Sequence, residues 1–155
     1  QQHRAHPADV CGRPERVDSL LDDPEVMTFA LEEFLRAYAP VTMGRLVTED
    51  LDFHGCPMKK DDWVLLSFPA ANRDPAMFPD ADKVIIDRKE NRHAAFGLGI
   101  HRCVGNRLAE LQLRVIWEEI LARFPVIEVV SDPKRVYSTF IKGYENLMVR
   151  IPKRA

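Results

Sequence analysis

The sequence predicts a mainly α-helical fold with a small antiparallel β-sheet. Two segments carry apolar residues at helical spacing, residues 24–39 and residues 106–124. Short β-like runs and a long stretch without periodicity lie between them. The chain has 155 residues, of which 46% are hydrophobic and 30% are charged, so its composition is typical of one globular domain with its own core.

The first helix is expected over residues 24–39. Asp22 or Asp23 can cap its N-terminus, and Pro40 stops it. The apolar residues that define its buried face recur three or four positions apart: Val26, Ala30, Leu31, Phe34, Leu35 and Tyr38.

Three β-like runs follow, at residues 45–48, 51–53 and 63–66. The connection between the second and third runs contains Gly55 and a polar tip at residues 59–62, both typical of turns. These features predict a small antiparallel ribbon.

The next segment, residues 70–90, is rich in Pro and Asp and lacks periodicity; we call it the long loop. A loop of this length inside a compact domain is often functional. The second helix begins after Gly105 and ends before Pro125, and the tail to residue 151 is expected to form strands with a turn at Gly143. The apolar residues of the second helix are expected to form one face: Leu108, Leu111, Val115, Ile116 and Ile120.

Composition excludes several classes of protein. A net charge of -2 gives no reason to expect nucleic acid as a partner. No apolar run is long enough to cross a bilayer, and the first residues do not resemble a signal peptide. Cys11, Cys56 and Cys103 are odd in number and lack the spacing of a metal site, which argues against disulfides or structural zinc. We therefore expect a cytoplasmic location.

The segment FGLGIHRCVG, residues 96–105, carries the candidate chemistry; we call it the cysteine loop. Gly97 and Gly99 allow the backbone to pass close to a large flat ligand. Cys103 directly precedes a long helix, whose N-terminal N–H groups stabilise a thiolate. A thiolate is one of the ligands that hold haem iron. The residues alone leave two other interpretations: a buried cysteine in a glycine-rich turn, or a nucleophile with His101 as its base.

The spacing of Phe96, Gly99, Cys103 and Gly105 resembles the haem-loop signature of the cytochrome P450 family. A His two positions before the Cys is typical of its bacterial members. The resemblance covers residues 24–151 and implies, in order, the family's K helix, small β-sheet, meander (AANRDP, residues 70–75), haem loop, L helix and C-terminal hairpin. Residues 1–21 match the family poorly, so residues 22–155 are expected to be the incomplete C-terminal part of a P450 domain.

The resemblance also implies a structural ion network. Glu33 and Arg36 lie three positions apart on the first helix, and Arg88 stands in the long loop where the family has a third charged partner. In the family these three residues form a buried network that supports the cysteine loop and takes no part in the chemistry.

By the same resemblance the cofactor is haem b (iron protoporphyrin IX), with Cys103 as iron ligand and catalytic residue. Arg45 and His101 occupy positions that bind the haem propionates. The full set of expected cofactor contacts is Phe96, Gly97, Gly99, His101, Cys103, Gly105 and Arg45. The positions expected to contact a hydrophobic substrate are Val41, Thr42, Met43, Thr139, Phe140 and Ile141.

The implied function is a haem-thiolate monooxygenase. The family's central helix, which covers the distal side of the haem, is absent from this sequence, so the chain alone is expected to be inactive. Residues 103–113 are similar to bacterial alkane and fatty-acid terminal hydroxylases.

The implied partners are a ferredoxin and a ferredoxin reductase, with electrons ultimately from NAD(P)H. Arg102, Arg107 and Arg114 are candidates for the docking face. The alternatives are a haem-binding module without catalysis and a non-functional remnant.

Overall fold

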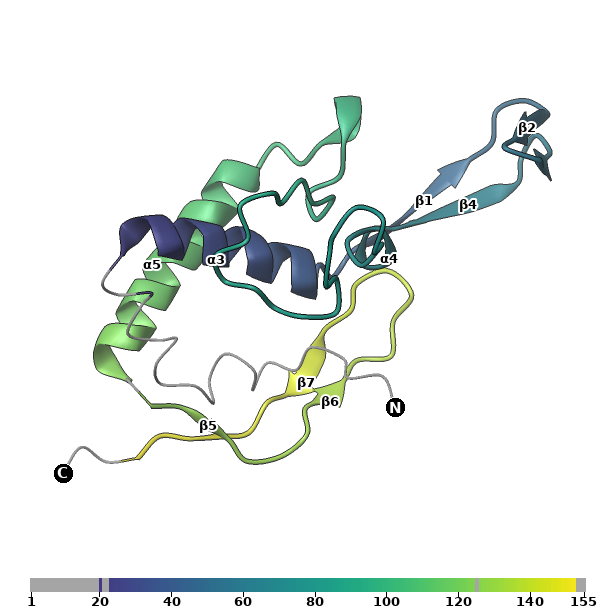
Figure 1. The fold of residues 1–155 in the computed structure, drawn as a ribbon. Coiled ribbons are helices and arrows are strands. Elements are labelled where there is room, and N and C mark those ends of the chain that lie inside the picture. Colours follow the sequence, from purple (N-terminus) through teal and green to yellow (C-terminus); the bar gives the residue numbers. More distant parts are fainter. Residues whose placement is uncertain (1–19, 21–22, 125, 153–155) are drawn as a thin grey trace.

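A computed structural model describes residue 20, residues 23–124 and residues 126–152 of the chain. Two long helices cross each other, a strand ribbon projects from one side, and short strand pairs lie below the helices in the view of Figure 1. The expected combination of helices with small antiparallel sheets is confirmed. Apart from Leu20, the segment 1–21 lies outside the described residues.

Helix α3, Pro24–Tyr38, forms where the sequence predicts it. Asp23 is the N-cap residue, and its Oδ1 accepts a hydrogen bond from the Glu25 amide at 2.8 Å. Pro24 occupies the first helical turn, where its missing N–H costs nothing. Asp22, the other predicted cap, lies outside the described residues.

The ribbon consists of four strands in two nested antiparallel pairs. Its strands are β1 Thr42–Leu46, β2 Leu51–Phe53, β3 Cys56–Met58 and β4 Trp63–Ser67, with β1 paired to β4 and β2 to β3. Strand β3, which is three residues long and contains a proline, is not predicted by the sequence pattern. His54 and Gly55, at φ values of 51° and 84°, make the tight turn before it.

The long loop and the cysteine loop contain little regular structure. A short helix, α4 Phe68–Ala71, covers the first two residues of the long loop. A 3-10 turn, η1 Gly99–His101, lies within the cysteine loop, and α5 Asn106–Arg123 follows it as predicted.

Helix α5 carries apolar residues on a second side in addition to the predicted apolar face. Leu121 is buried, and Leu113 and Trp117 are partly buried against α3. Because α3 covers only one side of α5, most residues of the predicted apolar face are exposed: Leu108, Leu111, Val115 and Ile116. A helix with apolar residues on opposite sides is typical of the interior of a larger fold.

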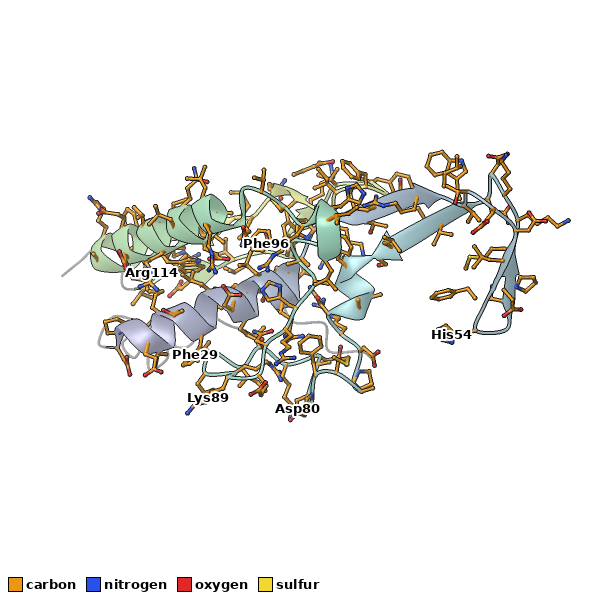
Figure 2. The ribbon with its side chains drawn as sticks, turned by 90° about the horizontal axis from the view of Figure 1, so that it is seen from above. Phe29, His54, Asp80, Lys89, Phe96 and Arg114 are labelled. Carbon is orange, nitrogen blue, oxygen red and sulfur yellow. The ribbon has the colours of Figure 1, made fainter. Side chains whose placement is uncertain are left out.

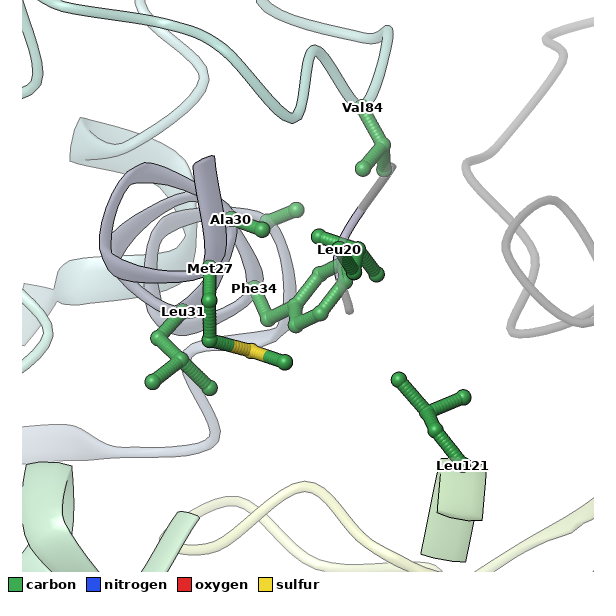
Figure 3. Close-up of a cluster of buried hydrophobic side chains, with 8 residues drawn as sticks. Leu20, Met27, Ala30, Leu31, Phe34, Val84 and Leu121 are labelled. Carbon is green, nitrogen blue, oxygen red and sulfur yellow. The ribbon is translucent and has the colours of Figure 1, made fainter. Parts of the chain in front are cut away.

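The core lies where α3 meets α5 and the long loop (Figure 3). Phe34 of α3 packs its ring 5.4 Å from the ring of Trp117 on α5. The buried cluster consists of Leu20, Met27, Ala30, Leu31, Phe34, Ala37, Val84 and Leu121.

The tail forms two short strand pairs, as the sequence predicts. The strands are β5 Glu128–Val129, β6 Lys134–Arg135, β7 Tyr144–Asn146 and β8 Val149–Arg150, with β5 paired to β8 and β6 to β7. Gly143 lies in the turn between β6 and β7, where its carbonyl accepts a hydrogen bond from the Val136 amide. Among the described residues no helix is both long and apolar enough to span a membrane.

Candidate functional site

Helix α3 lies between α5 and the long loop. In Figure 2, Arg114 marks α5 on one side of α3, while Asp80 and Lys89 mark the long loop on the other. The apolar side chains of α3 pack against α5, and its charged residues Glu33 and Arg36 face the loop. The helix therefore connects the core of the fold with the loops that carry the candidate site.

Glu33, Arg36 and Arg88 meet in a buried ion network. Glu33 and Arg36 are fully buried, and two parallel hydrogen bonds join them: Arg36 Nε to Glu33 Oε2 at 2.7 Å and Arg36 Nη2 to Glu33 Oε1 at 2.8 Å. Arg88 Nε also donates to Glu33 Oε2, at 3.0 Å. Paired contacts of this kind, between a guanidinium and a carboxylate, are strong and directional.

The same charged groups hold the backbone of the long loop. Arg36 donates to the carbonyl oxygens of Asn72, Ala81 and Lys83, each at 2.8 Å. Glu33 Oε1 accepts from the Ile85 amide at 2.9 Å, and Arg88 Nη1 donates to the carbonyl of Pro79 at 2.9 Å. A loop without regular structure thereby gains partners for its backbone groups, and the buried charges are compensated.

Backbone hydrogen bonds close the cysteine loop and join it to the residues just before it. Gly97 N donates to Ala94 O and Cys103 N donates to Phe96 O, both at 2.9 Å. Gly97 and Gly99 have φ values of +69° and +66°, in the left-handed region that side chains disfavour. Within this chain, the backbone conformation is therefore what requires glycine at these two positions.

Cys103 presents its thiol at the start of α5. It is exposed and lies two residues before Gly105, the N-cap of the helix. The same loop carries exposed apolar residues, with Leu98, Ile100 and Val104 at 72%, 97% and 102% exposure. An accessible thiol at a helix N-terminus, on a loop that also exposes apolar side chains, is a donor that fits a large apolar ring with a metal at its centre.

The two expected propionate ligands lie on separate elements. His101 is exposed at the end of η1, whereas Arg45 lies half-buried on β1 and donates from Nη1 to the Gly44 carbonyl at 2.8 Å. Within the described part of the chain, no hydrogen bond joins Arg45 to the cysteine loop. Nor does one join His101 to Cys103, as a base and nucleophile pair would need.

The two segments expected to contact substrate lie side by side. Thr42 N donates to Phe140 O at 2.9 Å, and an isolated bridge pairs Val41 with Ile141. Lys142 N adds a hydrogen bond to Pro40 O at 2.7 Å. The segment that leads from α3 into β1 and the turn between β6 and β7 therefore lie side by side, although they are about a hundred residues apart in the sequence.

The expected basic docking face has mixed charge. Arg107 pairs with Glu110 at 2.9 Å, and Arg114 lies 4.0 Å from Glu118. Both arginines also line a groove between α3 and α5 of about 290 Å³, together with Glu32. Neighbouring carboxylates therefore reduce the positive field of the helix, while Arg102 remains exposed in the cysteine loop.

Sequence reasoning missed three side chains that join these loops: Asn72, Asn91 and His93. Asn91 Nδ2 donates to Glu33 Oε2 at 3.2 Å, which adds a fourth residue to the ion network. Asn72 is the middle of the AANRDP segment, and His93 lies three residues before Phe96. Their position in or beside these two motifs could have drawn attention to Asn72 and His93. The motifs do not, however, reveal the contacts that these side chains make to α3.

Comparison with known proteins gives a clear result. The chain belongs to the cytochrome P450 family, whose family model matches residues 19–151. It is 39% identical over 143 residues to linalool 8-monooxygenase of Pseudomonas putida, and 40% identical over 136 residues to a steroid C26-monooxygenase of Mycolicibacterium smegmatis. These alignments cover 91% and 85% of the chain but only 35% and 34% of the relatives, so the chain spans about a third of their length.

A solved structure gives the same picture. The cytochrome P450 PksS of the bacillaene polyketide synthase from Bacillus subtilis aligns with a TM-score of 0.86 at 33% identity. The alignment covers 94% of this chain and 39% of that protein. Both the fold and the family are therefore those of a bacterial P450.

Proposed function

We propose that this chain is the haem-thiolate-binding part of a bacterial cytochrome P450 monooxygenase, and that Cys103 is its iron ligand. The observation that supports it most strongly is the exposed Cys103 thiol at the N-terminus of α5, on a loop closed by the hydrogen bond from Cys103 N to Phe96 O. The N–H groups at the start of α5 stabilise the thiolate that iron requires. Activity requires the complete protein, because the chain spans only a third of its relatives.

The other residues of the site act by binding and orientation. Phe96, Gly97, Gly99 and Gly105 shape the loop around the cofactor, and His101 and Arg45 are the cationic or hydrogen-bonding partners for the propionates of haem b. When bound, haem would supply the oxidant that inserts one atom of O₂ into a C–H bond, while two electrons from a partner and two protons reduce the other atom to water. The network of Glu33, Arg36 and Arg88 keeps the loops in place and does no chemistry.

A hydrophobic substrate fits the surface formed by residues 41–43 and 139–141. Phe140 and Ile141 are exposed there, with apolar Val41 opposite Ile141. The relatives named for linalool and for a steroid support an aliphatic substrate, in agreement with the similarity of residues 103–113 to alkane and fatty-acid hydroxylases. We further propose a ferredoxin and its reductase as the cytoplasmic source of electrons, drawn from NAD(P)H.

The test is a reduced-plus-CO difference spectrum of the purified chain after addition of hemin. We expect a strongly red-shifted Soret band, characteristic of thiolate-ligated iron, which disappears in Cys103→Ala. Cys56→Ala is the matched control, because Cys56 is also exposed but lies on the ribbon in β3. A band that persists in Cys103→Ala, or that disappears in Cys56→Ala, would contradict the assignment.

A further inference from the structure

Two consecutive backbone amides at the entrance of the cysteine loop are held by side chains. Ala94 N donates to Asn72 Oδ1 at 2.7 Å, and Ala95 N donates to His93 Nδ1 at 3.2 Å. Most loop amides bind water or a backbone carbonyl, so a pair of adjacent amides bound to buried side chains fixes the path of this segment closely.

Asn72 connects this segment to the ion network. Its side chain is almost fully buried, at 1% exposure, and its Nδ2 donates to the Arg36 carbonyl at 3.3 Å. Its own carbonyl accepts from Arg36 Nη1 at 2.8 Å. Asn72 therefore makes contacts to α3 with two of its groups and to Ala94, just before the cysteine loop, with a third.

His93 makes a second connection to the same helix. Its side chain is 5% exposed, and its Nε2 lies 3.0 Å from Glu32 Oε2. Nδ1 accepts a hydrogen bond from the Ala95 amide, so the proton of the neutral ring lies on Nε2. The Nε2–H group then donates a hydrogen bond to Glu32. Glu32 and Glu33 are neighbours on α3, so one turn of the helix holds both the long loop and the start of the cysteine loop.

The segment of Ala94 and Ala95 is linked to the cysteine loop, and so to Cys103, by backbone hydrogen bonds. Ala94 O accepts from Gly97 N, and Phe96 O accepts from Cys103 N, both at 2.9 Å. We propose that Asn72 and His93 are positioning residues, which fix the entrance of the cysteine loop on α3 and thereby set the place of the Cys103 thiolate. The inference rests on the proposed function only in assigning that thiolate to iron.

Partial isosteres of His93 separate its two contacts. Asn at position 93 retains an acceptor near the place of Nδ1 but is too short to reach Glu32. Gln retains a donor near the place of Nε2 but lacks the acceptor for Ala95 N. At position 72, Asp retains the acceptor for Ala94 N, whereas Ala removes both side-chain contacts. His54→Asn, at the exposed turn of the ribbon (Figure 2), is the matched control.

Amide hydrogen exchange of the purified chain, measured without haem, tests whether Asn72 and His93 hold the entrance of the cysteine loop. Loss of one such hydrogen bond should speed exchange about fivefold to tenfold. We expect His93→Gln to accelerate the Ala95 and Cys103 amides, and Asn72→Ala to accelerate those of Ala94 and Cys103. His93→Asn, which loses the contact with Glu32, should accelerate the Cys103 amide but not that of Ala95. His54→Asn should leave the Cys103 amide near the wild-type rate. Unchanged exchange at Cys103 in both His93→Gln and Asn72→Ala, or uniform acceleration of all amides, would overturn the proposal.

The CO difference spectrum of the same variants gives a second readout. His93→Gln and Asn72→Ala should convert part of the red-shifted band into an unshifted one, as a misplaced thiolate is protonated or lost, and His93→Asn should convert less. If the wild-type chain gives no red-shifted band, the chain alone does not hold haem through Cys103, while the exchange data still decide whether Asn72 and His93 position the loop. Equal spectra in all variants beside altered exchange would remove the positioning role.

Discussion

Replacing Glu33 with Gln is expected to lower the free energy of unfolding by about 3–5 kcal/mol. The carboxylate of Glu33 is fully buried and accepts from Arg36, Arg88, Asn91 and the Ile85 amide. The neutral amide removes the charge that compensates two guanidinium groups, and its NH₂ group faces donors. An uncompensated buried charge costs far more than a lost surface pair. The long loop, which Arg36 and Arg88 hold, should become less ordered when the Glu33 carboxylate is lost.

Urea denaturation of the purified chain, followed by tryptophan fluorescence, measures this loss. Trp117 packs against Phe34 in the core and therefore reports on unfolding, while Trp63 is 75% exposed. Glu128→Gln is the control, because Glu128 makes a 3.3 Å ion pair with Arg150 at the surface. We expect the control to change stability little. An equal effect of the two substitutions would mean that the buried network contributes no more than a surface pair.

Phe34→Ala should destabilise the chain by a similar amount, about 3–5 kcal/mol, through loss of packing. Phe34 is 9% exposed and belongs to the buried cluster between α3 and α5. Truncation leaves a cavity beside Trp117, whose ring lies 5.4 Å away, and the rest of the core is too small to close it. The ion network faces the other side of α3, so its contacts should survive in the folded fraction.

The measurement is again urea denaturation, now with Phe53→Ala as the control for the same change of side chain. Phe53 lies at the end of β2 with 57% exposure, so its loss should have little effect. The emission of native Phe34→Ala should also shift, since Trp117 loses an aromatic neighbour. Comparable destabilisation by both substitutions would show that the α3 and α5 contact is not the main core of this chain.

Local signals in the sequence predicted much of the fold. Asp23 and the prolines at positions 24 and 40 define α3 to within a residue, because capping and proline act on their own neighbours. The cysteine before α5 was equally predictable, since the loop, its glycines and the helix are adjacent. The short strand β3 was missed because it has three residues and a proline, too few to show alternation.

Contacts between distant residues were harder to predict. The resemblance to a known family anticipated that Glu33, Arg36 and Arg88 would meet, which their spacing alone does not show. Asn72 and His93 escaped, since their partners on α3 are 36 and 61 residues away in the sequence. The apolar face of α5 was predicted but its exposure was not, because periodicity identifies an apolar face and does not say what covers it.

Iron K-edge X-ray absorption of the hemin-loaded chain tests most directly whether Cys103 binds the iron. We predict one sulfur atom in the first coordination shell of the iron, retained in Cys56→Ala and lost in Cys103→Ala. A shell of only nitrogen and oxygen atoms in the wild-type chain, or a sulfur atom that remains in Cys103→Ala, would contradict the assignment of Cys103 as the ligand.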